Sequence, residues 1–86
     1  MDSTLSIRVT VLDSWDEIPL DLPATTSLAE VKRAALSRSR VRGAPADYVL
    51  KYQGAELFME GQSLAEAGIR PDSALIVLRR RRTPVR

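Results

Sequence analysis

The sequence predicts a small α+β domain in which one sheet packs against one main helix. The chain has 86 residues, which is room for one domain. Alternation of polar and apolar residues, the pattern of a half-buried strand, occurs both before and after one stretch with helical spacing. Two strands before a helix and more strands after it favour an α+β fold with the helix across one face of the sheet.

The N-terminal part predicts a hairpin. Residues 6–11 alternate polar and apolar, with β-branched residues at the apolar places. A turn-rich break follows at 13–17, and apolar residues alternate again over 18–22. Because Pro19 has no N–H to donate to a neighbouring strand, we expect the second strand to lie at an edge of the sheet or to begin there.

The main helix is predicted to start near Ser27 and to end by Gly43. Ser27 and Glu30 have the spacing of a capping box, in which the hydroxyl accepts from the Glu30 N–H and the carboxylate reaches back. Apolar residues follow at helical spacing, and arginines gather near the expected end, where cations meet the negative helix terminus. Gly43 and Pro45 then prevent continuation.

The C-terminal half predicts three further strands and a short helix. The strands are expected at 48–52, at 56–58 and at 74–78. Residues 63–66 repeat the capping pattern, but Gly68 allows only a short helix after it. The side chains predicted to point into the core are Ile7, Val9, Val11, Ile18, Leu20, Leu22, Leu28, Val31, Ala35, Leu50, Tyr52, Leu57, Leu64, Ile69, Leu75 and Val77.

In order and spacing, these segments resemble ubiquitin from about residue 5 to residue 81. The resemblance implies a β-grasp fold with a mixed four- to five-stranded sheet, one main helix and one short helix. It makes residues 1–81 a ubiquitin-like domain and leaves 82–86 as a basic tail that we expect to be disordered. The segments that carry the resemblance are the opening hairpin, Leu28-Ala29-Glu30-Val31-Lys32, residues 50–57, residues 63–69 and residues 72–79.

The composition excludes several kinds of site. Without cysteine or histidine there are no disulfides, thiol nucleophiles, imidazole catalysts or common zinc sites. Four acids around one turn, Asp13, Asp16, Glu17 and Asp21, have no such partner to complete a reaction centre. No glycine-rich phosphate loop or metal-ligand spacing occurs. We therefore expect no enzyme activity, no cofactor, no metal and no small-molecule substrate.

Two departures from ubiquitin bear on function. Conjugation of ubiquitin uses a flexible tail that ends in two glycines, whereas Pro84 and Val85 stand in the matching region here and the chain has no Gly-Gly pair. We therefore expect no conjugation through the C-terminus. The isoleucine at the centre of ubiquitin's apolar binding patch corresponds to Lys51, and a histidine in its last strand corresponds to Ile76. Proteins that bind ubiquitin's patch are therefore not expected to bind this one.

We place the binding surface on the outer face of the sheet, opposite the helix. Its residues are Arg8, Val49, Lys51, Ile76 and Leu78, an apolar centre bordered by two cations. The partner is expected to be another protein or a second copy of this chain. The alternative is that these apolar side chains are scattered and bind nothing, as is ordinary on small proteins.

Trp15, the only tryptophan, stands in the first hairpin turn. Exposed at the tip of a loop, it would be a protein-binding anchor. The alternative is that it folds back over the hairpin or against residues 36–41.

The basic residues are unevenly distributed although the formal net charge is only +2. Residues 79–86 hold five of the 13 bases and none of the 11 acids, so this segment carries +5 and residues 1–78 carry −3. A run of four arginines, Arg79, Arg80, Arg81 and Arg82, predicts either weak anion binding, to anionic lipid or nucleic acid, or a solvated end that binds nothing. No aromatic residue stands beside the arginines to stack on bases.

The resemblance extends to the small ubiquitin-like proteins of bacterial type VII secretion systems, although no motif identifies that subgroup. A content of 11 Arg and two Lys favours a bacterial protein, and the lack of a signal sequence and of cysteine favours the cytoplasm. Two alternatives remain: an adaptor that acts through the arginines, and the cytosolic N-terminal domain of a larger membrane protein.

Overall fold

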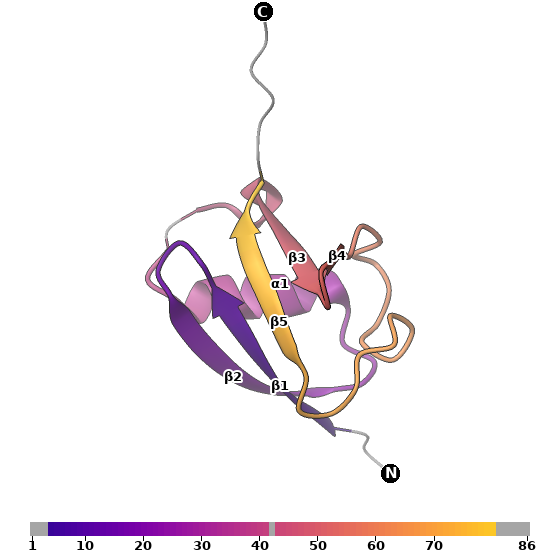
Figure 1. Ribbon diagram of the computed structural model, residues 1–86. Coiled ribbons are helices and arrows are strands. Elements are labelled where there is room, and N and C mark those ends of the chain that lie inside the picture. Colours follow the sequence, from indigo (N-terminus) through magenta and orange to yellow (C-terminus); the bar gives the residue numbers. More distant parts are fainter. Residues whose placement is uncertain (1–3, 42, 81–86) are drawn as a thin grey trace, which may run out of the picture.

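The computed structural model describes residues 4–41 and 43–80. Figure 1 shows a five-stranded sheet with one helix, α1, crossing one of its faces, as expected for the α+β class. The elements in chain order are β1 (Thr4–Val11), β2 (Asp16–Pro23), α1 (Leu28–Arg38), the 3₁₀ helix η1 (Pro45–Asp47), β3 (Tyr48–Tyr52), β4 (Ala55–Glu56) and β5 (Ala74–Arg79).

The strand order across the sheet is β2-β1-β5-β3-β4. β1 pairs with β5 in parallel, and the remaining neighbours are antiparallel, so the sheet is mixed. The first and last strands of the chain therefore lie side by side at the centre of the sheet. β2 is an edge strand, which confirms the expectation drawn from Pro19.

α1 begins and ends within the predicted bounds. Ser27 is its N-cap, and the Ser27 hydroxyl accepts from the Glu30 N–H at 3.2 Å. The return half of the capping box does not form, because the Glu30 carboxylate pairs with Arg33 one turn further along the helix. At the other end the Ser39 N–H donates to the carbonyls of Ala35 and Leu36 and closes the last turn.

The predicted short helix at 63–66 is wrong in length, since the chain forms one turn there and continues as irregular backbone. Both halves of the capping box are made: the Glu66 N–H donates to Ser63 Oγ at 3.1 Å, and the Ser63 N–H donates to Glu66 Oε1 at 2.9 Å. Gly68, at φ +78°, then turns the chain out of helical geometry. The helix-like element that the sequence did not predict is η1.

The two Ser-Leu-Ala-Glu segments hold each other in place through an isolated antiparallel bridge between Ser27 and Ser63. Each segment gives its first two amides after the serine to carbonyls in or next to the other segment. These bonds run from Leu28 and Ala29 to Gln62 and Glu60, and from Leu64 and Ala65 to Thr26 and Ala24. The amides at the start of α1 are thereby satisfied within the protein.

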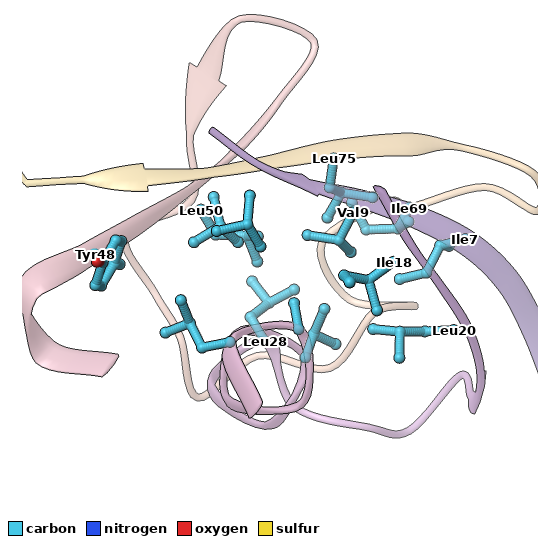
Figure 2. Packing of buried hydrophobic residues seen from close by; sticks show 14 of the residues in the cluster. Ile7, Val9, Ile18, Leu20, Leu28, Tyr48, Leu50, Ile69 and Leu75 are labelled. Atoms are coloured by element: carbon cyan, nitrogen blue, oxygen red, sulfur yellow. The ribbon is translucent and has the colours of Figure 1, made fainter. Parts of the chain in front are cut away.

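The core lies between α1 and the sheet, as Figure 2 shows. Thirteen of the sixteen predicted inward side chains are buried there, and the other three, Leu22, Tyr52 and Leu57, pack against the cluster while partly exposed. The sequence reading missed Tyr48 and Leu36, both of which are buried. It also missed Lys32, a buried cation whose Nζ donates to the Tyr48 carbonyl at 2.9 Å and to Glu60 at 2.7 Å.

Candidate functional site

The outer face of the sheet carries the side chains that the pleat turns away from α1. Strand register places Ile76 of β5 between Thr10 of β1 and Lys51 of β3. Two residues along, Leu78 lies opposite Val49. Side chains alternate along each strand, and the neighbouring residues Val9, Leu50, Leu75 and Val77 are in the core. The side chains that share the outer face are therefore Thr10, Val49, Lys51, Ile76 and Leu78.

The structure therefore brings the predicted outer-face residues together but exposes them unequally. Ile76 is 40% exposed and Arg8 is also exposed, whereas Lys51 and Leu78 are half-buried. Val49 is only 6% exposed, so its expected place at the centre of a binding patch needs correction. It lies on an interior strand, paired with Leu78 on β5, and supports the patch rather than offering surface to a partner.

The charges around this face are mixed, although the sequence reading expected a border of Arg8 and Lys51 alone. Glu56 of β4 lies directly opposite Lys51, and Glu17 of β2 lies opposite Thr10. The Arg8 guanidinium reaches the Asp72 carbonyl at 3.5 Å, at the start of β5. A partner at this face would therefore meet an isoleucine flanked by both signs of charge.

The free edge of β2 is poorly suited to adding a strand from another molecule. The Arg8 N–H donates to Ser73 at the β5 side, so Arg8 and Pro19 form a pair without mutual hydrogen bonds. Pro19 and every second residue on either side of it along β2 therefore point their backbone N–H and C=O positions to the open edge. These residues are Glu17, Pro19, Asp21 and Pro23, and two of the four have no N–H to donate. The edge of β2 is therefore less suited to pairing with a further strand than the face is to side-chain contacts.

Arg79, at the end of β5, is committed to contacts within the protein. Its guanidinium donates to the Tyr48 hydroxyl at 3.0 Å, pairs with Asp13 Oδ2 at 3.2 Å, and lies 5.1 Å from the centre of the Tyr48 ring. The Tyr48 hydroxyl in turn donates to Asp13 at 3.0 Å. Burial, and after it the Asp13 carboxylate, raises the pKa of Tyr48 above its ordinary value. The phenol therefore remains a neutral donor.

These contacts bear on the arginine run that was predicted to bind anions. Arg79 is paired with Asp13. The backbone of Arg80 is held in place, because its backbone N–H donates to the Asp47 carbonyl at 2.7 Å. The Arg80 side chain also reaches the Ala46 carbonyl at 3.4 Å. Arg81 and Arg82 lie outside the described residues, as does the tail over 82–86.

Trp15 is 78% exposed at the tip of the β1–β2 turn, so the interpretation in which it folds back is wrong. Its φ is +56°, the left-handed region that glycine or asparagine occupies more readily than an aromatic residue. Sequence reasoning also overlooked two exposed apolar side chains after β4, Phe58 at 77% and Met59 at 67%. Their neighbours Glu60 and Gly61 marked this stretch as a loop and were the available signal.

Neither a metal centre nor a membrane-crossing helix occurs in the described part of the chain. Within residues 4–41 and 43–80, no three acidic side chains gather closely enough to hold a metal ion. No helix in these ranges is long and apolar enough to cross a membrane.

Comparison with models of known protein families gives no match, and comparison with curated proteins gives none either. Solved structures do match over nearly the whole chain. The ubiquitin-like domain of an Arabidopsis thaliana protein aligns with 96% of this chain and 84% of its own, with a TM-score of 0.75 and 17% identity. Caldiarchaeum subterraneum ubiquitin aligns with 95% of this chain and 100% of its own, with a TM-score of 0.78 and 13% identity.

A designed protein based on ubiquitin aligns with 96% of each chain, with a TM-score of 0.77 and 19% identity. At these identities the likeness concerns the fold. The chain has a ubiquitin-like fold, with a five-stranded mixed sheet, one main helix and a 3₁₀ turn.

Proposed function

We propose that this protein is a non-enzymatic interaction module that binds another protein, or a second copy of itself, through the outer face of its sheet around Ile76. The observation that carries the proposal is the position of Ile76. It is an apolar, β-branched side chain at 40% exposure in the middle of the sheet, on the face that α1 does not cover. Half-buried Leu78 extends the apolar surface along β5, and the buried Val49 supports it from β3.

Two further features support binding at the face. The prolines at the open edge of β2 disfavour strand addition there, and β4 at the other edge has only two residues to offer. The mixed charges of Lys51, Glu56 and Glu17 suit a polar rim, which specific interfaces place around an apolar centre.

Action by binding rather than by conjugation is also part of this proposal. After β5, Pro84 and Val85 stand in the region that matches ubiquitin's glycine tail, and their side chains hinder entry into a narrow catalytic groove. A link to type VII secretion stays a prediction from the resemblance. Since Arg79 and Arg80 are held by Asp13 and by residues 46–47, an adaptor role through the arginines has less support.

Photo-crosslinking from the two sides of the molecule tests the proposal. A photoreactive phenylalanine analogue replaces Thr10, which lies beside Ile76 on the outer face, or Ala65, an exposed residue in the turn after the Ser63 cap. We expect a discrete crosslinked product from position 10 and none from position 65. A product of twice the protein's mass would identify a second copy as the partner. Equal products from both positions, or none from position 10, would contradict the proposal.

A further inference from the structure

A groove at the end of α1 forms a second surface, separate from the outer face of the sheet. It has a volume of about 580 Å³ and is open to solvent. Buried Leu36 forms part of its lining together with the partly exposed Val41 and the exposed Pro45, so the lining has an apolar component. Arg33 and Arg40 also line it. The lining contains no acidic side chain among the residues that the structure describes.

Arg40 is the main source of positive charge in this groove, because Arg33 is paired with Glu30. The C-terminal end of a helix carries partial negative charge, so α1 itself does not attract an anion here. The Arg40 side chain is 86% exposed, and its Nε is 3.7 Å from Asp16 Oδ1, longer than a hydrogen bond. Within the described residues its two terminal amino groups make no hydrogen bond, and they carry four of the five N–H donors of a guanidinium. Arg40 can therefore bind a second carboxylate.

The β1–β2 turn, which carries Trp15, is tied to the segment after α1 that lines this groove. Asp16 accepts the Arg40 N–H at 3.0 Å, which ties the β1–β2 turn to the loop after α1. Asp13 accepts from the Tyr48 hydroxyl, and Tyr48 packs so closely on Gly43 that a Cβ at residue 43 would lie 2.4 Å from its ring. The turn and the loop lie next to each other in Figure 1.

Trp15 has two unfavourable features that a purely structural turn residue would avoid. Its left-handed backbone costs about 1 kcal/mol for a residue with a side chain. Its indole, the largest apolar side chain that the sequence holds, is left in water. Asparagine or glycine would remove both costs. Strain of this kind at an exposed tryptophan points to a function of the side chain.

We propose that Trp15 and the groove lined by Leu36, Arg40 and Val41 bind a segment of a partner protein in which apolar side chains are flanked by carboxylates. The apolar side chains enter the groove against Leu36 and Val41, a carboxylate pairs with Arg40, and the indole of Trp15 packs against the segment. Asp13, Asp16 and Glu17 are close to Trp15 in the sequence, so the segment meets the indole with apolar side chains and keeps its carboxylates at the Arg40 end of the groove.

The test uses synthetic peptides with the protein's own tryptophan as the probe, since Trp15 is the only one in the chain. Peptide Glu-Glu-Leu-Leu-Glu-Glu is compared with Lys-Lys-Leu-Leu-Lys-Lys and with Glu-Glu-Ser-Ser-Glu-Glu. We expect the first to shift Trp15 emission to the blue in a saturable way, and to move the backbone amide signals of residues 15–17 and 33–41. The other two peptides should bind at least about fivefold more weakly, since each lacks one of the two interactions.

Variants separate this surface from the face around Ile76. Trp15→Asn should weaken binding of the first peptide by at least about tenfold, measured from the backbone amide signals because this variant has no tryptophan. Arg40→Ser should weaken it by roughly fivefold. Arg38→Ser, a matched exposed arginine of α1 that does not line the groove, and Ile76→Asp should change it less than twofold.

Three results would overturn the inference. One is the absence of a saturable emission change with the glutamate–leucine peptide, and another is equal binding of the lysine peptide. The third is an emission shift with phosphatidylserine vesicles but not with the peptide, which would make a membrane the ligand. If Trp15→Asn fails to fold, Trp15 is structural, and Arg40→Ser alone then decides whether the groove binds acidic segments. Failure of any of these tests leaves the proposal at Ile76 standing, because that proposal rests on crosslinking from Thr10.

Discussion

The two faces of the sheet are built from the same strands and differ in what covers them. Leu75 and Val77 are fully buried in the core between the sheet and α1, whereas Ile76 between them lies on the other face and is 40% exposed. The two lysines show a similar contrast, since Lys32 of α1 is buried against the Tyr48 carbonyl and Lys51 is half-buried on the outer face of the sheet. The buried side chains of the inner face therefore contribute more to the stability of the fold than those of the outer face.

The largest expected effect is at Leu75. Leu75→Ala should lower the free energy of unfolding by about 2–5 kcal/mol, because it removes fully buried methyl groups and leaves a cavity. Ile76→Ala, one residue along the same strand, should cost about 1 kcal/mol or less, mostly through lower β propensity. Urea unfolding of the two variants measures both values. Equal costs would mean that the faces do not differ in the way described.

Replacing each of the two lysines with methionine compares the same change at a buried and at a half-buried position. Lys32→Met should cost about 2 kcal/mol, because the Tyr48 carbonyl and Glu60 lose a charged donor at 2.9 and 2.7 Å. Lys51→Met should cost less than about 0.5 kcal/mol, since solvent replaces its contacts. Thermal unfolding of both variants beside the wild type gives the comparison. A more stable Lys32→Met protein would show that burying this ion pair is a net cost, as happens in some proteins.

The phenol of Tyr48 is the polar contact between the core and the β1–β2 turn. Tyr48→Phe should cost about 1 kcal/mol, because it removes the hydrogen bonds to Asp13 and from Arg79 and leaves those two residues paired. Because the pKa of Tyr48 is raised in the folded protein, its contribution is present below the unfolded-state pKa and is lost as pH rises through the folded-state value.

Stability curves between pH 8 and pH 12 therefore provide a second readout for Tyr48. The wild type should lose stability more steeply than Tyr48→Phe above a pH of about 10, the ordinary value for tyrosine. Parallel curves for the two proteins would mean that the pKa of this phenol does not differ between the folded and unfolded states.

Most of the fold could be predicted from local pattern. Alternation placed β1, β2, β3 and β5, and Ser27 placed the start of α1 because capping depends on nearby residues. The helix ends at Arg38, before the limit that Gly43 set. The two Ser-Leu-Ala-Glu segments show the limit of such reasoning. The same four residues begin an 11-residue helix at Ser27 and a single turn at Ser63, because the residues after each segment, and not the cap, set the length.

The candidate surfaces were less accessible to sequence reasoning. The faces of β3 and β5 could be assigned from alternation, but the burial of Val49 depends on neighbouring strands that pattern does not place. The pairing of Arg79 with Asp13 and the bond from the Arg40 N–H to Asp16 join residues far apart in the chain, and no local pattern predicts such contacts. The sequence left open whether Trp15 is exposed at the tip of the turn or folds back over the hairpin, and the structure shows that it is exposed.

The central claim is that Ile76 belongs to a binding surface and not to the core. The most direct measurement is crosslinking from position 10 in an Ile76→Asp background, with Met59→Asp as the matched control at another exposed apolar side chain. We expect Ile76→Asp to remain folded, to lose about 1 kcal/mol of stability or less, and to give no crosslinked product, while Met59→Asp gives the wild-type product. An unfolded Ile76→Asp protein, or a folded one with an undiminished product, would contradict the account.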